Sequence, residues 1–273
     1  MHSSFHPVHW LVFNAVGLLV QGVHTPDVLS VHPRLQSDFD AFLPAVRSRV
    51  LARTGGFDGP CAALTSWAYT SVPTSGPARL SITTGMRTYC QSNTLKQLMV
   101  KDVLWAQQRS LWLPNGIQPD ATCSWGSSLT TVVLLPGNSI LVGKRSDNLQ
   151  TNPSKWSCLF TEILEPSDVT LSSMEPLLDR LVQEELPFFK KLGLHRFVGL
   201  MLVPECYTWT LVSVLDLRAL PIEPLDAMLA TLSPDEETQA WTRVMLHPVL
   251  DEMGDSNIII GLALARSIAD CLQ

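Results

Sequence analysis

The sequence lacks several features by which common classes of protein are recognised. Only 16% of its 273 residues are charged, and no run of lysine or arginine occurs. The net charge is −6 and the pI is near 5.6, whereas proteins that bind nucleic acid nonspecifically present a basic face. The composition therefore predicts no nucleic-acid partner. A hydrophobic content of 46% predicts a folded chain with a sizeable core.

Cysteine pairs at metal-binding spacing are also missing. The six cysteines are scattered through the chain, with no Cys-x-x-Cys among them: Cys61, Cys90, Cys123, Cys158, Cys206 and Cys271. Irregular spacing in a long chain favours free thiols over a disulfide framework. We therefore expect a reducing compartment, and a cytoplasmic location.

No apolar run is long enough to span a membrane, so we expect no membrane partner. Residues 10–20 resemble the apolar region of a signal peptide. However, no lysine or arginine precedes them and no clear small-residue cleavage site follows. We expect instead two short strands around residues 14–17. An unrelated secreted α/β protein remains an alternative.

The usual motifs of nucleophilic and nucleotide-binding enzymes are absent. The chain contains no Gly-x-Ser-x-Gly elbow, no Walker loop and no Gly-x-Gly-x-x-Gly. His195 and His247 have no partner that the sequence identifies. Any catalytic chemistry must come from another arrangement of side chains.

The first part of the chain predicts an extension made of strands and helices. A helix is expected over residues 35–51, although Pro44 lies inside it. A hairpin follows at 62–69 and 78–85, and then a helix from Asn93 or Thr94 towards Leu104. Residues 113–120 form a loop, Leu-Pro-Asn-Gly-Ile-Gln-Pro-Asp. We place a boundary there, between an N-terminal extension (1–118) and a second domain (119–273).

The second part predicts an α/β fold, a mixed sheet flanked by helices. A Pro-Gly-Asn turn at 136–138 joins apolar, β-branched strands into a hairpin. The remaining expected elements are strands at 128–135, 139–146, 156–162, 197–203, 208–215 and 241–249, and helices at 173–186, 225–232 and 258–272.

The helix expected near residues 173–186 carries an unusual acid. Leu178, Leu181 and Val182 share one face, and Glu185 falls between Leu181 and Val182 on that face. Glu184 lies at its edge, one turn from Arg180. A carboxylate in an apolar stripe is costly unless a metal ion, an arginine or a proton pairs with it.

This order of elements, with Arg180-x-x-x-Glu184-Glu185 on the helix, resembles the Nudix hydrolase superfamily. Its box reads Gly-x5-Glu-x7-Arg-Glu-U-x-Glu-Glu-x-Gly-U, where U is apolar. The matching positions in this chain are Arg180, Val182, Glu184, Glu185 and Phe188. The layout, with an N-terminal strand and helix segment before a degenerate box, is similar to the branch that cleaves UDP-sugars.

The resemblance implies a Nudix-like fold and a hydrolase that cleaves the diphosphate of a nucleoside diphosphate linked to another group, such as a nucleotide sugar. Glu184 and Glu185 would hold Mg²⁺ or Mn²⁺, because hard cations take carboxylate ligands. Arg180 would orient the two glutamates. Lys144 or Arg145, at the end of a strand, would contact phosphate.

The chain departs from the box at several positions. Leu181 stands where the box has the first glutamate of the helix, Pro187 replaces the glycine, and Ser172 occupies the place of the earlier glutamate. Glu162 or Glu165 could substitute only with a changed loop. These departures favour the alternative, a Nudix-fold ligand-binding or scaffold protein without catalysis. Trp156 and Trp241 are more typical of core residues than of base-stacking platforms.

Overall fold

The computed structural model describes residues 9–53, 58–71, 78–114, 116–147, 154, 156–157, 159–186, 194–203, 207–232 and 238–245. The strands are β1 (His9–Val28), β2 (Pro60–Thr70), β3 (Ala78–Thr88), β4 (Leu111–Leu113), β5 (Gly116–Gln118), β6 (Ser128–Leu135), β7 (Ser139–Arg145), β8 (Trp156–Ser157), β9 (Leu159–Ile163), β10 (Leu194–Val203), β11 (Thr208–Asp216) and β12 (Thr238–Met245). The helices are α1 (Pro33–Arg53), α2 (Tyr89–Lys101), α3 (Val103–Gln107), the short η1 (Pro166–Asp168), α4 (Glu175–Glu185) and α5 (Ile222–Leu229).

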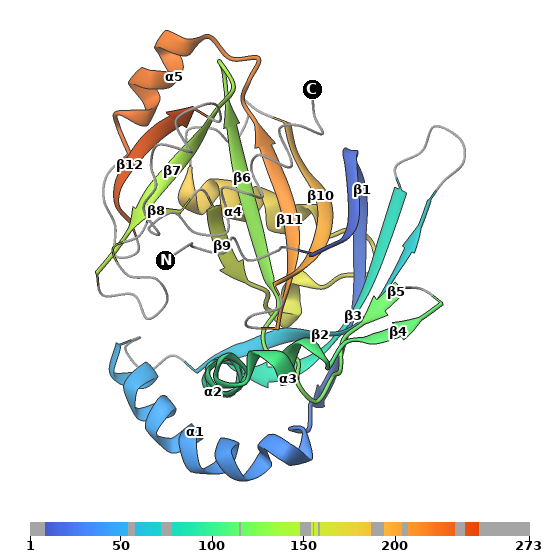
Figure 1. Cartoon of the computed structure of the whole chain (residues 1–273). Coiled ribbons are helices and arrows are strands. Elements are labelled where there is room, and N and C mark those ends of the chain that lie inside the picture. Colours follow the sequence, from blue (N-terminus) through green and yellow to red (C-terminus); the bar gives the residue numbers. More distant parts are fainter. Residues whose placement is uncertain are drawn as a thin grey trace.

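One mixed sheet runs through the described chain (Figure 1). Its strand order is β12-β7-β6-β11-β10-β1-β3-β2, with β8 paired to β7 and β9 paired to β6. The pairs β1–β3 and β11–β6 are parallel, and the other strand pairs of this sheet are antiparallel. The predicted fold class, a mixed sheet flanked by helices and preceded by a strand and helix extension, is confirmed.

A hydrophobic core connects α4 to the centre of the sheet. Leu177, Leu178, Leu181 and Val182 of α4 belong to the same buried cluster as Leu129 and Val133 of β6. At the end of the sheet formed by β2 and β3, α1 and α2 lie side by side (Figure 1), joined through Val46, Val50 and Cys90. Since β1 pairs with β10, the sheet continues across the predicted boundary near residue 118. The division into two domains stays a prediction.

Several boundaries differ from those expected. Residues 9–28 form one strand instead of two, with a break in pairing between Phe13 and Leu18 where Gly17 has φ of 125°. Helix α2 begins at Tyr89, because Thr88 and Gln91 form a capping box. The expected loop at 113–120 contains the turn of the β4–β5 hairpin. The expected helix at 258–272 lies outside the described residues.

Helix α1 continues through Pro44, as the apolar spacing predicts. The β6–β7 hairpin turns at Gly137 and Asn138, which both have positive φ, a conformation that these two residue types tolerate best. Among the helices in the described ranges, none combines the length and the apolar character needed to cross a membrane.

A side chain makes the hydrogen bonds to the edge strand β2 that the backbone of a neighbouring strand would make. The amide group of Gln118 on β5 accepts a hydrogen bond from Trp67 N (2.8 Å) and donates one to Trp67 O (2.7 Å). Further along β2, Leu64 N donates to Ser127 Oγ and Ala62 N donates to Leu164 O. An open strand edge invites pairing with another chain, and these contacts block that pairing.

We therefore expect Gln118→Leu to lower the free energy of unfolding by about 2 kcal/mol, because it leaves two backbone groups of Trp67 without their partners. The exposed Gln108→Leu serves as the matched control and should change stability by less than about 0.5 kcal/mol. Urea denaturation measures both values. Equal stability of the two variants would show that the Gln118 amide contributes nothing to the edge.

Candidate functional site

Helix α4 is positioned by its apolar face and by one arginine. Four of its residues are buried, Leu177, Leu178, Leu181 and Val182, as the helical spacing predicts. Leu186 ends the helix, and its backbone N–H donates to Val182 O. Leu181, which stands in place of a box glutamate, is only 2% exposed and belongs to the core. Its position therefore offers packing and no ligand to a site.

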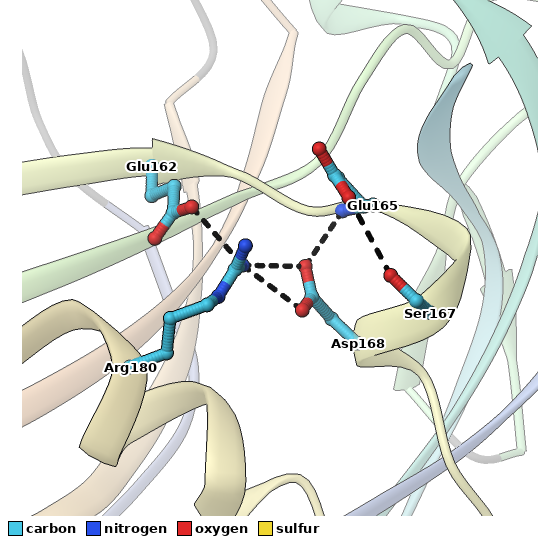
Figure 2. Close-up of polar contacts among 5 residues, drawn as sticks. All are labelled: Glu162, Glu165, Ser167, Asp168 and Arg180. Carbon is cyan, nitrogen blue, oxygen red and sulfur yellow. Dashed lines mark hydrogen bonds and ion pairs between the residues drawn. The ribbon is translucent and has the colours of Figure 1, made fainter. Parts of the chain in front are cut away.

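Arg180 joins α4 to two other elements, as Figure 2 shows. Its guanidinium lies 3.0 Å from Glu162 Oε1 on β9 and donates to both carboxylate oxygens of Asp168 on η1, at 2.9 and 3.0 Å. Asp168 Oδ2 also accepts the backbone N–H of Glu165 at 2.8 Å. The resemblance implied that Arg180 would orient Glu184 and Glu185, and that role stays a prediction. The contacts with Glu162 and Asp168 fix α4 against β9 and the loop that leads to the helix.

The acids around Arg180 outnumber it. Burial raises the pKa of Glu162 to about 7, although the charge of Arg180 works in the opposite direction. The charges of Glu184, Asp168 and Glu165 raise the same pKa further. Burial also raises the pKa of Asp168. A 3.0 Å ion pair normally lowers an acid's pKa, but burial outweighs the charge of Arg180, which is shared with Asp168, and we therefore expect Glu162 to be partly protonated near neutral pH.

A pocket brings together two of the residues selected from the sequence. Glu185 from α4 and Arg145 from β7 both line it. The remaining lining residues come from β7, β8, β9 and β12: Gly143, Ser157, Phe160, Thr161, Thr238 and Trp241. Lys144 is half-buried, and because successive side chains of a strand point to opposite faces, it faces away from Arg145. Glu184, the residue before Glu185 in the sequence, is exposed.

An aromatic pair forms one wall of this pocket. The rings of Phe160 and Trp241 stack with centroids 5.1 Å apart and planes 29° apart. The indole of Trp241 lies across Gly143, where an added Cβ would come within 2.7 Å of the ring. A glycine at position 143 is therefore required for the observed position of Trp241.

The described residues fit a metal ion only in part. Among them, no group of three or more histidines, cysteines, aspartates or glutamates is arranged to hold one. The predicted set contributes two carboxylates here, exposed Glu184 and half-buried Glu185. Mg²⁺ commonly binds through one or two carboxylates together with substrate phosphates. The donor set suits such shared binding and does not suit an all-protein metal centre.

The sequence did not point to Asp168, and it pointed to Glu162 only as a replacement for the box glutamate that is missing at Ser172. A local signal was present, because Glu165-Pro166-Ser167-Asp168 has the spacing of a capping box, which forms here between Glu165 and Asp168. Their approach to Arg180 depends on the path of the loop between β9 and α4, which the spacing does not specify.

A second polar cluster is structural. His195 Nε2 lies 3.0 Å from Ser213 Oγ, which lies 2.6 Å from Thr131 Oγ1. Ser213 is fully buried and Thr131 is 2% exposed, so no substrate reaches the hydroxyl. Burial lowers the pKa of His195 to about 4. His247 lies outside the described residues, as does Pro187.

No family model and no curated protein matches the chain. Among solved structures it is similar to DR0079 from Deinococcus radiodurans, with 14% identity and a TM-score of 0.39 over 55% of this chain and 84% of that one. It is also similar to a MutT protein from Methanosarcina mazei Go1, with 17% identity and a TM-score of 0.34 over 54% of this chain and 93% of that one. Likeness at this level carries no argument about function, and membership of the Nudix superfamily stays a prediction from the box residues.

Proposed function

We propose that the protein is a hydrolase that cleaves the diphosphate of a nucleoside diphosphate linked to another group, with Mg²⁺ or Mn²⁺ as cofactor. One observation carries the proposal: Arg145 and Glu185 line the same pocket, although they are 40 positions apart in the sequence. A cation for phosphate and a carboxylate for a metal ion are the two functions that such a reaction needs at one place.

The side chains have distinct roles in this proposal. Arg145 binds phosphate oxygens through its planar guanidinium, which matches their geometry. Glu185 and Glu184 hold the metal ion together with the substrate. When bound, the ion neutralises phosphate oxygens and activates or orients water. Arg180 acts as a positioning residue, because its bonds to Glu162 and Asp168 hold α4 in place. Lys144, on the opposite face of β7, is the weaker of the two phosphate candidates.

The test is turnover of a panel of nucleoside diphosphate derivatives, nucleotide sugars included, with Mg²⁺ or Mn²⁺. We expect Glu185→Gln to reduce turnover at least about tenfold, because the amide keeps the shape of the side chain but loses the charge that holds a metal ion, and even partners that only orient a metal ligand contribute about 10–100-fold. The matched control is Glu175→Gln, an exposed acid in the first turn of the same helix, which should keep full activity. Equal turnover by the two variants, or no turnover of any substrate by the wild-type protein, would contradict the proposal.

A second candidate is a ligand-binding or scaffold protein of the same fold. It is favoured by Leu181, whose burial removes one carboxylate from the helix. Calorimetry separates the two candidates, since a ligand that binds tightly without metal and is never cleaved would support the second.

We also infer a cytoplasmic protein that acts on a small nucleotide derivative, without a nucleic-acid or membrane partner. Support for a reducing compartment comes from Cys61, Cys90 and Cys123, which are free and buried. Burial raises the pKa of all three thiols, to between about 11 and about 12, which keeps them unreactive at neutral pH.

A further inference from the structure

A second pocket is lined by residues of α5, β7 and β12, three elements that lie together in Figure 1. It has a volume of about 220 Å³. Leu141 of β7 and Leu229 and Ala230 at the end of α5 contribute apolar side chains to it. Asp226 of α5 and Trp241, Thr242 and Arg243 of β12 complete the lining.

The strand register places most of the β7 and β12 residues that line the two pockets on one face of the sheet, and only Thr242 of the second pocket lies on the other. Trp241 pairs with Gly143, and Arg243 pairs with Leu141. Positions 141, 143 and 145 of β7 alternate with 142 and 144, so they share a face. Trp241 lines both pockets and therefore stands between them. At about 3.3 Å per residue, Leu141 and Arg145 lie about 13 Å apart, which is the scale of one extended small molecule.

The two volumes suit different chemical groups. The first pocket, about 30 Å³, has room for only a few water-sized atoms, and a phosphoryl oxygen is of that size. The second pocket, at about 220 Å³, exceeds the ~150 Å³ of an apolar cavity that holds benzene. A ring therefore fits beside α5 and does not fit beside Arg145.

The polar groups at the second pocket are already ordered. Arg243 donates to Ser139 Oγ at 2.7 Å and also to Pro136 O, and it pairs with Asp226 Oδ1 at 3.3 Å. Asp226 is half exposed and can accept N–H donors from a ligand in the pocket. Since the indole of Trp241 already stacks on Phe160, a ligand in this pocket meets it as an aromatic neighbour beside such acceptors, which favours a flat, nitrogen-bearing ring because aromatic rings pack well edge to face or offset.

We propose that the pocket beside α5 binds the nucleobase of the substrate, with Trp241 between the base and the phosphates at Arg145. This inference rests on the proposed function and names the part of the site that recognises the nucleoside. It assigns Leu141, Ala230 and Trp241 to base recognition.

The test compares nucleoside 5′-monophosphates with ribose 5-phosphate, which has the same sugar and phosphate but no base. At least one nucleotide should bind about tenfold or more tightly than ribose 5-phosphate, as measured by calorimetry. Ala230→Leu, at an exposed position of the pocket rim, should fill the space and reduce nucleotide affinity to that of ribose 5-phosphate. The affinity for ribose 5-phosphate itself should not change.

Ala227→Leu is the matched control, because Ala227 is exposed on the same helix and does not line the pocket. Retained nucleotide preference in Ala230→Leu, or equal binding of nucleotides and ribose 5-phosphate, would overturn the inference while leaving the hydrolase proposal standing. Failure of the hydrolase proposal is recognised separately, by the absence of metal-dependent turnover. If neither the nucleotides nor ribose 5-phosphate bind, the inference of a base pocket is also overturned.

Discussion

Replacing Arg87 by methionine is expected to lower the free energy of unfolding by at least about 4 kcal/mol, which few single substitutions do. The side chain is 1% exposed, and its hydrogen bonds go to five backbone carbonyls: Ser124 O (2.5 Å), Ser30 O (2.9 Å), Leu29 O (3.0 Å), Thr122 O (3.3 Å) and Ala121 O (3.4 Å). Hydrogen bonds to a charged group contribute about 1.5–3 kcal/mol each. Methionine donates to none of these carbonyls, and among the described residues only Thr122 O of the five has another donor, the backbone N–H of His32. Chemical denaturation of the purified variant measures the loss.

Two further variants keep this prediction testable. Arg87→Lys retains a charge but lacks the planar fork of donors, so we expect a loss between those of the wild type and the methionine variant. Burial lowers the pKa of Arg87 to about 10, so the group is protonated at neutral pH and its donors are all present. Arg79→Met, at an exposed position of the same strand, should cost less than about 0.5 kcal/mol. A loss below about 1 kcal/mol for Arg87→Met would show that the carbonyls find other donors.

Arg87 illustrates which parts of the fold the sequence does not reveal. Its five acceptors lie in two segments, residues 29–30 and 121–124, that are far from it and from each other along the chain. No spacing rule connects a strand residue to such partners. The capping box of Thr88 and Gln91 is different, because its Thr-x-x-Gln pattern is local and was available to predict the start of α2.

The candidate site divides in the same way. The apolar stripe of α4 follows from helical periodicity, and the half-buried position of Glu185 follows from its angle to Leu181 and Val182. The meeting of Glu185 with Arg145 was inferred only through resemblance to a family. The bonds of Arg180 to Glu162 and Asp168 depend on the loop between β9 and α4, whose path is set by tertiary packing. Local pattern therefore predicts elements, while long-range contacts decide what the elements bring together.

Stability should depend on pH through two groups that act in opposite directions. Burial lowers the pKa of His195 from 6.5 to about 4, so the unfolded chain binds more protons in this range and stability falls as the pH falls through it. Burial raises the pKa of Glu162 from 4.5 to about 7, so the folded chain holds the extra proton and stability falls as the pH rises through that range. Each shift corresponds to about 3 kcal/mol. In the wild type the two effects largely cancel between pH 4.5 and 6.5.

Single variants should therefore uncover the opposite slopes. Relative to the wild type, Glu162→Gln should gain about 3 kcal/mol of stability as the pH rises from 4.5 to 7, because the amide has no proton to lose. His195→Gln should show the reverse, a relative gain of about 3 kcal/mol as the pH falls from 6.5 to 4. Urea titrations at fixed pH give the curves, and differences from the wild type remove the contributions of the other acids. The double variant should combine both changes, since the two groups lie on separate strands and have different partners. A Glu162→Gln curve parallel to that of the wild type would mean that Arg180 keeps Glu162 ionised, and the site would then carry more negative charge at neutral pH than we infer.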